Sequence, residues 1–249
     1  MVKSMILKAF NALGFDIVRI GHFSLERDGE FLEIYEKIKK FSTHSIQRLY
    51  ALYKAMLYIV QNDVPGDIVE CGVWRGGSSM LSARVLASMG ETKRKIFLYD
   101  TFEGMARPTE KDKTFFNLKA INKWEKLIRE KNKNKWKYVP LDEVKRNMYS
   151  TGYPKENISF IKGKVEDTLP ENNPGRIALL HLDTDWFEST NHELVNLYPL
   201  LSNLGVIIID DYGTWLGQRE AVDKYIKKNN LKILLNRIDS FGAMGIKVN

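Results

Sequence analysis

The chain has 249 residues, of which 44% are hydrophobic and 28% charged, and its formal net charge is +7. These values are typical of a globular protein with one sizeable domain and extensions, and no apolar run approaches the roughly 18–20 residues of a membrane span. The single cysteine, Cys71, excludes an internal disulfide framework and predicts a reducing, cytoplasmic location. Residues 1–20 lack a long apolar core and a cleavage site, so we expect no signal peptide.

The positive charge is concentrated in residues 111–146. This segment holds twelve of the 38 Lys and Arg residues and five of the 31 Asp and Glu residues, so the rest of the chain carries 26 of each. We interpret the segment as a solvated insertion that can serve as a lid, in preference to a phosphate-binding patch. No nucleic-acid partner is expected.

Residues 1–62 are predicted to form an N-terminal helical extension. Residues 1–20 carry apolar side chains at helical spacing, which indicates a packing or dimer helix, with attachment to a membrane surface as the alternative. We expect a homodimer and no stable membrane association. Two more helices are predicted at Phe31–Lys40 and Ser45–Val60, and Asp63–Gly66 ends the second and begins a domain over residues 63–249.

The stretch Ile68–Ser79, IVECGVWRGGSS, reads as a strand, a glycine turn and the start of a helix over Met80–Met89. Such a unit presents backbone N–H groups and a helix N-terminus to a ligand. Gly72 lets the backbone come close to a ligand, and Gly76–Gly77 permit a tight turn that Ser78 can cap. The spacing differs from the dinucleotide fingerprint, and on its own it fits a tight turn as well as a ligand site.

Strands and helices alternate through the rest of the chain. Apolar runs predict strands at Lys95–Asp100, Ile158–Lys162, Ile177–Leu182 and Gly205–Ile209, and helices are expected at Leu141–Tyr149, Phe187–Leu201 and Gln218–Lys228. Leu231–Leu235 and Ala243–Val248 can form a terminal antiparallel pair. Continuous apolar strands indicate a parallel sheet that is covered on both faces, so the predicted fold is α/β, with a seven-stranded, mostly parallel, Rossmann-like sheet.

Acidic residues gather where these strands end. They are Glu70, Asp100, Glu166, Asp167, Asp183, Asp185, Asp210 and Asp211. Carboxylates that converge at one edge of a sheet repel one another unless they share a cation or neutral donors. A single acid is more often a helix cap than a ligand, but Asp183, Asp210 and Asp211 follow consecutive strands and together predict a Mg²⁺ site.

Asp100 ends the second strand, 28 residues beyond Gly72. An acid in this position can accept hydrogen bonds from the two hydroxyls of a ribose. The glycine turn and this acid together indicate an adenosine-containing ligand, and the absence of a P-loop motif disfavours a nucleotide triphosphate enzyme.

Six ordered motifs between Ser45 and Lys247 resemble the macrocin O-methyltransferase family, whose known members methylate sugar hydroxyls of antibiotics. The motifs are VPGDIVECGVWRGGSS, YDTFEGM, TGYP, EDTLP, LDTDWFEST and IIDDYG. The resemblance implies a class I S-adenosylmethionine-dependent fold with a Mg²⁺ site. The lysine-rich insertion, at the place of the substrate lid, is a departure from the family pattern.

The resemblance also implies roles for individual residues. Glu70 and Gly72 would lie along the methionine part of S-adenosylmethionine, Asp100 would hold its ribose, and Glu166 and Asp167 would flank its adenine. Thr43 and Ser78 are assigned to the same cofactor site. The implied metal ligands are Asp183, Asp210 and Asp211.

Catechol-type methyltransferases look similar at these strand ends but place a lysine base three residues after the first acid. That position here is Trp186, so a carboxylate must accept the proton. We expect Asp183 to be the catalytic residue, with Asp185 or water as the alternative acceptor. His181 is a weaker candidate, because it falls one step deeper on the same side of the strand.

The predicted activity is methyl transfer from S-adenosylmethionine to a hydroxyl of a sugar or similar acceptor that bears a neighbouring hydroxyl. Two rival functions remain at this point. Asp183-Thr184-Asp185 is a D-x-D sequence that a metal-dependent glycosyltransferase could use. A non-catalytic binding protein on the same fold is the other alternative.

Overall fold

The computed structural model describes residue 25 and residues 28–130 and 133–248. Its main sheet has seven strands in the order β5-β2-β1-β6-β7-β9-β8. The first five strands in this order are parallel, and β9 and β8 are antiparallel to their neighbours. The strands are β1 (Asp67–Cys71), β2 (Ile96–Asp100), β5 (Ile158–Lys162), β6 (Ile177–Leu182), β7 (Leu201–Ile209), β8 (Asn236–Arg237) and β9 (Ala243–Ile246). The predicted seven-stranded, mostly parallel α/β fold is confirmed.

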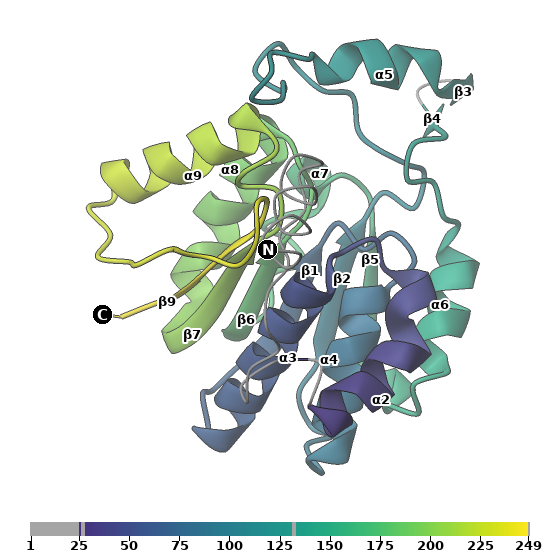
Figure 1. Cartoon of the computed structure of the whole chain (residues 1–249), viewed down its shortest axis with the longest axis vertical. Coiled ribbons are helices and arrows are strands. Elements are labelled where there is room, and N and C mark those ends of the chain that lie inside the picture. Colours follow the sequence, from purple (N-terminus) through teal and green to yellow (C-terminus); the bar gives the residue numbers. More distant parts are fainter. Residues whose placement is uncertain (1–24, 26–27, 131–132, 249) are drawn as a thin grey trace, which may run out of the picture.

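Helices cover both faces of the sheet (Figure 1). One face packs against α2 (Gly29–Ile38), α3 (Ile46–Gln61), α4 (Gly77–Ser88) and α6 (Leu141–Tyr149). The other packs against α7 (Val165–Thr168), α8 (Phe187–Leu197) and α9 (Leu216–Lys228). Three short 3₁₀ helices complete the layers: η2 (Lys39–Phe41), η3 (Lys155–Asn157) and η4 (Tyr198–Leu200).

Alternation along the strands fills two hydrophobic cores. In β1, Ile68 packs into the core under α3 and α4, and Val69 packs into the core under α8. In β6, Leu179 packs into the core under α3 and α4, and Leu180 packs into the core under α8. Full burial of each such side chain contributes about 1.5–3 kcal/mol. The period of two also places His181 on the α3–α4 side of β6, where the structure buries it.

The order of the strands fixes where a ligand can bind. β1 pairs with β2 on one side and with β6 on the other, so the order in which strands are added to the sheet reverses direction at β1. The carboxyl ends of parallel strands on either side of such a switch point leave a crevice between their loops. The predicted acids follow the strands around this crevice.

The helices α3 and α4 begin with different caps. Ser45 caps α3, because its hydroxyl accepts from Arg48 N (3.1 Å) and donates to Asp239 Oδ2 (2.6 Å). Gly76 precedes α4 with a φ of +89°, a conformation that favours glycine. The expectation that Ser78 caps this helix is therefore wrong, because Ser78 lies inside the first turn.

The predicted helix at residues 1–20 falls outside the described residues. The next part of the predicted extension, α2 and α3, belongs to the helical layer on the sheet. Phe31 of α2 and Met56 of α3 are fully buried in the same core as Ile68. None of the helices in the described part of the chain combines the length and apolar character that a membrane crossing requires.

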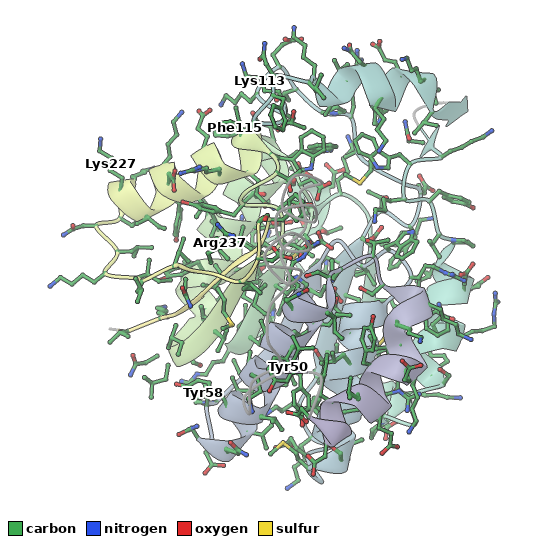
Figure 2. The ribbon with its side chains drawn as sticks, viewed as in Figure 1. Tyr50, Tyr58, Lys113, Phe115, Lys227 and Arg237 are labelled. Atoms are coloured by element: carbon green, nitrogen blue, oxygen red, sulfur yellow. The ribbon has the colours of Figure 1, made fainter. Side chains whose placement is uncertain are left out.

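The basic insertion contains α5 (Ala120–Lys126) and a hairpin of β3 (Ile128–Glu130) and β4 (Lys133–Asn134), set apart from the sheet at the top of Figure 1. Its first part is hydrogen-bonded to the domain through the buried Asp112. The carboxylate of Asp112 accepts from Thr109 N (2.6 Å) and from Phe187 N at the start of α8 (2.8 Å). Leu216 N also donates to Lys113 O (2.8 Å), and Figure 2 shows Lys113 and Phe115 close to this end of α9.

One predicted strand is misplaced. Leu231–Leu235 is not a strand, and β8 comprises Asn236–Arg237, opposite Met244 and Ala243 of β9. Three side chains of the apolar run, Leu231, Ile233 and Leu235, instead pack against the core as partly buried residues. The apolar pattern of residues 231–235 therefore reflects packing of side chains against the core, and not strand pairing.

Candidate active site

The turn after β1 is held by the carboxylate of Asp100 at the end of β2. Asp100 Oδ2 accepts from Val73 N (2.7 Å) and Trp74 N (3.1 Å), and Oδ1 accepts from Phe102 N (2.7 Å). The hydroxyl of Thr101 also lies 3.5 Å from Oδ1, so about four acceptor positions are used and this long contact is the one that a ligand hydroxyl could replace. Asp100 therefore shapes the glycine turn and still lines the cavity beside it.

Gly72 lies where the ends of β1 and β6 come closest. Its φ is +85°, and a Cβ at this position would collide with the carbonyl oxygen of Asp183. Asp183 N in turn donates to Cys71 O (2.8 Å), which extends the parallel pairing past the end of β6. Only glycine fits this approach, and the absence of a side chain leaves a free surface at the crevice.

A cavity of about 210 Å³ occupies the crevice. Of the predicted site residues it is lined by Thr43, Glu70, Gly72, Ser78, Asp100, Asp183, Asp210 and Asp211, and Asp185 lines it too. A neighbouring cavity of about 70 Å³ shares Gly72, Asp100 and Asp183 and adds Glu166. Asp167 lines neither, but faces a third cavity of about 530 Å³ beside Trp124 of α5. Seven of the eight acids expected at the strand ends therefore line the two adjoining cavities, together with Gly72.

The carboxylates form two overlapping groups that could hold a cation. One comprises Asp183, Asp185 and Asp211, and the other comprises His44, Asp183 and Asp210. In each group the candidate ligand atoms all lie within 4.8 Å of one another. The predicted ligands Asp183, Asp210 and Asp211 are thus divided between two positions that share Asp183. The donor set fits a divalent cation.

The electrostatics of the cluster follow from burial and crowding. Burial and the charge of Asp210 raise the pKa of Asp183 to about 7. Burial and the charge of Asp211 raise the pKa of Asp185 well above its usual range. Burial also disfavours ionisation of Asp210, but the neighbouring His44 and His181 outweigh it and hold the pKa of Asp210 well below its usual range. In the absence of a cation, the acids cannot all ionise together.

Basic side chains surround Asp210. Arg48 of α3 donates from Nη1 to Asp210 Oδ2, and its Nε lies 3.1 Å from Asp239 Oδ2. On the other side, His181 Nε2 lies 3.8 Å from Asp210 Oδ1, and His181 Nδ1 lies 3.4 Å from Glu70 Oε1. His181 is buried, as the sequence predicts, and it connects Glu70 to the acids at the end of β7.

Three predicted cofactor residues have partners within the protein. The Glu70 carboxylate accepts from the Ser79 hydroxyl. Ser78 Oγ lies 2.9 Å from His44 Nδ1, and the hydroxyl of Thr43 accepts from Lys137 Nζ (2.6 Å). The last contact joins the basic insertion to the segment before α3 across the cavity.

Trp186, at the position of a lysine base, is buried and precedes α8. Its Nε1 donates to Ala106 O (2.9 Å), and its ring packs against Trp136 and Trp215, with centroids 5.7 and 5.1 Å away. Trp136 belongs to the insertion and Trp215 caps α9. The position therefore carries an aromatic contact between the insertion and the domain, and no base.

Sequence reasoning missed His44, Arg48 and Lys137. The segment Ser42–Ser45 contains no motif, and only its place just before a capped helix could have drawn attention to His44. Arg48 follows the cap by three residues, and a positive residue in the first helical turn is unusual unless an acid compensates it. Lys137 is one of several lysines in the insertion, and nothing in the sequence distinguishes it from the others.

Comparison with known proteins identifies the family. The sequence profile of the macrocin O-methyltransferases (TylF) matches residues 40–245. The chain belongs to the macrocin O-methyltransferase family. It is therefore an S-adenosylmethionine-dependent O-methyltransferase, and its assignment to this enzyme family removes the glycosyltransferase and the non-catalytic binding protein as rivals.

Two relatives and one solved structure illustrate the similarity. The chain is 35% identical over 80% of its length, and 72% of the relative's, to an 8-demethyl-8-(2,3-dimethoxy-alpha-L-rhamnosyl)-tetracenomycin-C 4'-O-methyltransferase of Streptomyces olivaceus. It is 32% identical, with the same coverage, to a demethyldecarbamoylnovobiocin O-methyltransferase of Streptomyces niveus. The O-methyltransferase NovP superposes with a TM-score of 0.74 and 32% identity, over 84% of this chain and 83% of its own.

Proposed function

We propose that this macrocin-family enzyme transfers the methyl group of S-adenosylmethionine to a hydroxyl of a sugar or glycoside, with the help of a divalent cation. The observation that carries the proposal is the joined pair of cavities, which brings the glycine turn, the β2 acid and two cation-binding groups to one place. The name of the Streptomyces olivaceus relative, which specifies a rhamnosyl compound and O-methylation at a 4' position, supports a sugar acceptor.

The cofactor is proposed to lie along the Gly72 turn and across the end of β2. Asp100 Oδ1 would take a ribose hydroxyl in place of its long contact with the Thr101 hydroxyl, and Glu166 would lie beside the adenine in the smaller cavity. Thr43, Ser78 and Glu70 would line the methionine end. Asp167 faces the cavity beside Trp124, so in this arrangement its place is at the outer edge of the adenine.

Asp183, Asp210 and Asp211 are proposed to hold the cation, which is Mg²⁺ in the expectation from the sequence. Asp183 and Asp210 would do so at the position that includes His44, and Asp183 and Asp211 at the position that includes Asp185. Bound there, a divalent cation would polarise two neighbouring acceptor hydroxyls and lower their pKa. The carboxylates would hold those hydroxyls in line with the cofactor's methyl group. Holding the two reactants in this geometry lowers the entropic part of the reaction barrier.

The chemistry requires one proton acceptor. The methyl carbon forms a bond to the acceptor oxygen and breaks its bond to sulfur, S-adenosylhomocysteine leaves, and the hydroxyl proton passes to a carboxylate. Asp183 is the proposed acceptor, and Asp185 is the alternative, since both line the cavity and Trp186 carries no base. Asp185 has a φ of +72°, an uncommon conformation for a non-glycine residue that often marks active sites.

A panel of acceptors tests the proposal. The enzyme is incubated with S-adenosylmethionine and a divalent cation, and three kinds of acceptor are compared: glycosides with free vicinal hydroxyls, the same glycosides with one hydroxyl removed, and a catechol. We expect methylation of the first kind only, loss of turnover with a chelator, and recovery on addition of Mg²⁺. Methylation of the catechol but of no glycoside would contradict the sugar acceptor, and full turnover in chelator would contradict the cation.

Other expectations stay predictions. The acceptor is taken to be a small molecule, the partner in solution a second copy of the chain, and the location the cytoplasm. The division at residues 62 and 63 and the role of residues 111–146 as a lid also stay predictions. Sedimentation of the purified protein would decide the homodimer directly.

A further inference from the structure

We propose that His44 is a ligand of the cation, so that the site combines nitrogen and oxygen donors and selects a first-row transition ion such as Mn²⁺ or Co²⁺ over Mg²⁺. The inference rests on the proposed function for the presence of a divalent cation. It goes further in naming a ligand outside the strand ends and the class of ion that this ligand favours.

The imidazole of His44 is fixed in place from both sides. Nδ1 lies 2.9 Å from Ser78 Oγ at the start of α4, and the side chain is only 10% exposed. Nε2 lies 3.1 Å from Asp183 Oδ2 and 3.2 Å from Asp210 Oδ2. The ring also packs edge-on against His181, with centroids 5.7 Å apart. One nitrogen therefore meets a hydroxyl, and the other meets two carboxylates.

These separations fit ligands of one ion. Two cis ligands of an octahedral ion at bond lengths of about 2.1 Å stand roughly 3.0 Å apart. The distances from Nε2 to the two carboxylate oxygens are close to that value, and all three atoms lie within 4.8 Å of one another. The geometry allows a cation to sit on the side of the three atoms that faces the cavity.

The hydrogen bond at the far side of the ring supports the same assignment. When Nδ1–H donates to Ser78 Oγ, Nε2 is left to face the carboxylates of Asp183 and Asp210. That arrangement needs a positive charge between Nε2 and the two carboxylates, and either a proton on Nε2 or a bound cation supplies it. A partner that holds the other ring nitrogen in place is usual for a metal-binding histidine.

A second buried imidazole points to the same place. His181 Nε2 forms no hydrogen bond with any described residue, although its side chain is only 4% exposed, and it faces Asp210 Oδ1 at 3.8 Å. Asp210 Oδ2 also accepts from Arg48, and each carboxylate oxygen has a further lone pair for a cation. Asp210 is thereby held by basic groups on either side, with its remaining lone pairs toward His44.

The nature of the donors sets the selectivity. Oxygen ligands alone suit Mg²⁺ and Mn²⁺, whereas an imidazole adds affinity for the first-row transition ions and little for Mg²⁺. Removal of the imidazole should therefore weaken Co²⁺ binding by about tenfold or more and change Mg²⁺ binding far less. This difference separates a ligand from a residue that only donates a hydrogen bond.

The test measures metal binding directly, without an acceptor. The full chain, saturated with S-adenosylhomocysteine, is titrated by calorimetry with Co²⁺, Mn²⁺ or Mg²⁺ alone. The nitrogen coupling of bound Mn²⁺ is then recorded by pulsed electron paramagnetic resonance. His44→Asn retains a hydrogen-bonding group of similar reach. The control is His192→Asn on α8, whose ring contacts Leu169 O (3.2 Å) and which belongs to neither cation group and lines neither of the two cavities.

We expect a nitrogen coupling in the wild type and in His192→Asn, its loss in His44→Asn, and the selective loss of Co²⁺ affinity. A bound ion without nitrogen coupling, or a coupling that persists in His44→Asn, would overturn the assignment, the latter in favour of His181. Absence of any divalent binding by the wild type would contradict the proposed cation itself. The wild-type spectrum needs no variant, so it decides the question even if His44→Asn fails to fold.

Discussion

Asp183 is the carboxylate that both candidate cation positions share, and it lies directly after β6 at the closest approach of β1. Asp210 and Asp211 each belong to one position only. A change at Asp183 should therefore affect cation binding at either position, and it should also remove the proposed proton acceptor. Changes at Asp210 or Asp211 should affect cation binding alone.

The first prediction compares these acids by amide substitution. Asp210→Asn and Asp211→Asn each remove a charge but keep an oxygen donor, so they should raise the metal concentration that gives half-maximal activity. Asp183→Asn should lower turnover by about 10²–10⁴-fold even at saturating metal, because a general base is lost. Steady-state rates over a metal titration measure this, with Asp223→Asn, an exposed acid of α9, as the control. Full rescue of Asp183→Asn by metal would leave Asp183 a ligand only and assign the proton to Asp185.

A second prediction at this scale concerns Asp100. Its carboxylate accepts from three backbone N–H groups and would bind the ribose, so Asp100→Ala should leave buried donors without a partner. S-adenosylhomocysteine binding should weaken by about 1–3 kcal/mol. Calorimetry on this variant and on the exposed control Asp142→Ala measures the difference. Unchanged affinity in Asp100→Ala would exclude a ribose contact.

At the scale of elements, α8 packs on the sheet with an acid facing the core. Glu193 is fully buried beside the Thr184 hydroxyl and the Cys71 thiol, and no hydrogen bond of ordinary length and angle reaches its carboxylate from the described residues. Burial raises the pKa of Glu193 well above its usual range, so this carboxyl holds its proton to a higher pH in the folded protein than in the unfolded chain. The helix therefore carries a group whose ionisation opposes folding.

The sign of the effect follows from proton linkage. Above the unfolded pKa of about 4.3, the unfolded chain releases the Glu193 proton while the folded protein retains it, so the free energy of unfolding falls as pH rises. Glu193→Gln should flatten this decline between pH 5 and pH 8, as measured by chemical denaturation. Glu188→Gln, an exposed change on the same helix, should keep the wild-type slope. Equal slopes in all three proteins would mean that Glu193 ionises normally in the fold.

At the scale of the whole molecule, the basic insertion connects three parts of the protein. Asp112 binds the start of α8, Trp136 packs against Trp186 and Trp215, and Lys137 reaches Thr43 across the cavity. A segment fixed at its base and in contact with the cavity is suited to cover a bound acceptor.

The prediction for the insertion uses limited proteolysis. Trypsin should cut first within Lys111–Lys137, acceptor or product analogues should slow the cutting, and Asp112→Ala should accelerate it because the link to α8 is lost. The exposed change Asp142→Ala on α6 should leave the rate of cutting as in the wild type. If cleavage in the segment leaves turnover unchanged, the lid is wrong and the segment is a solvated insertion.

Much of the fold and of the acid cluster could be predicted because both follow from local pattern. Strand Ile177–Leu182 is a continuous apolar run, and parallel strands bring the residues after them to one edge, so Asp183 and Asp210 had to meet. Gly72 was expected to let the backbone approach a ligand, and that stays a prediction; the approach that the structure shows is to the carbonyl oxygen of Asp183, which local pattern could not indicate.

Contacts between residues that are far apart in the sequence could not be predicted from local pattern. His44 lies 139 residues before Asp183, and only the placement of α3 on the sheet brings the two together. The strand pairing near the C-terminus depends on β9 and not on the apolar run before it, so the predicted strand at Leu231–Leu235 was misplaced. Serine is a common capping residue, but Gly76, in the left-handed conformation, occupies the N-cap position of α4. Ser78 therefore lies within the first turn.

The central claim is that the cavity at the switch point holds S-adenosylmethionine. Calorimetric titration of the purified chain with S-adenosylhomocysteine, UDP-sugars and NAD tests it most directly. The account predicts saturable binding of S-adenosylhomocysteine at one site per chain and no heat from the other two ligands. Tight binding of a UDP-sugar in the absence of any S-adenosylhomocysteine binding would contradict it.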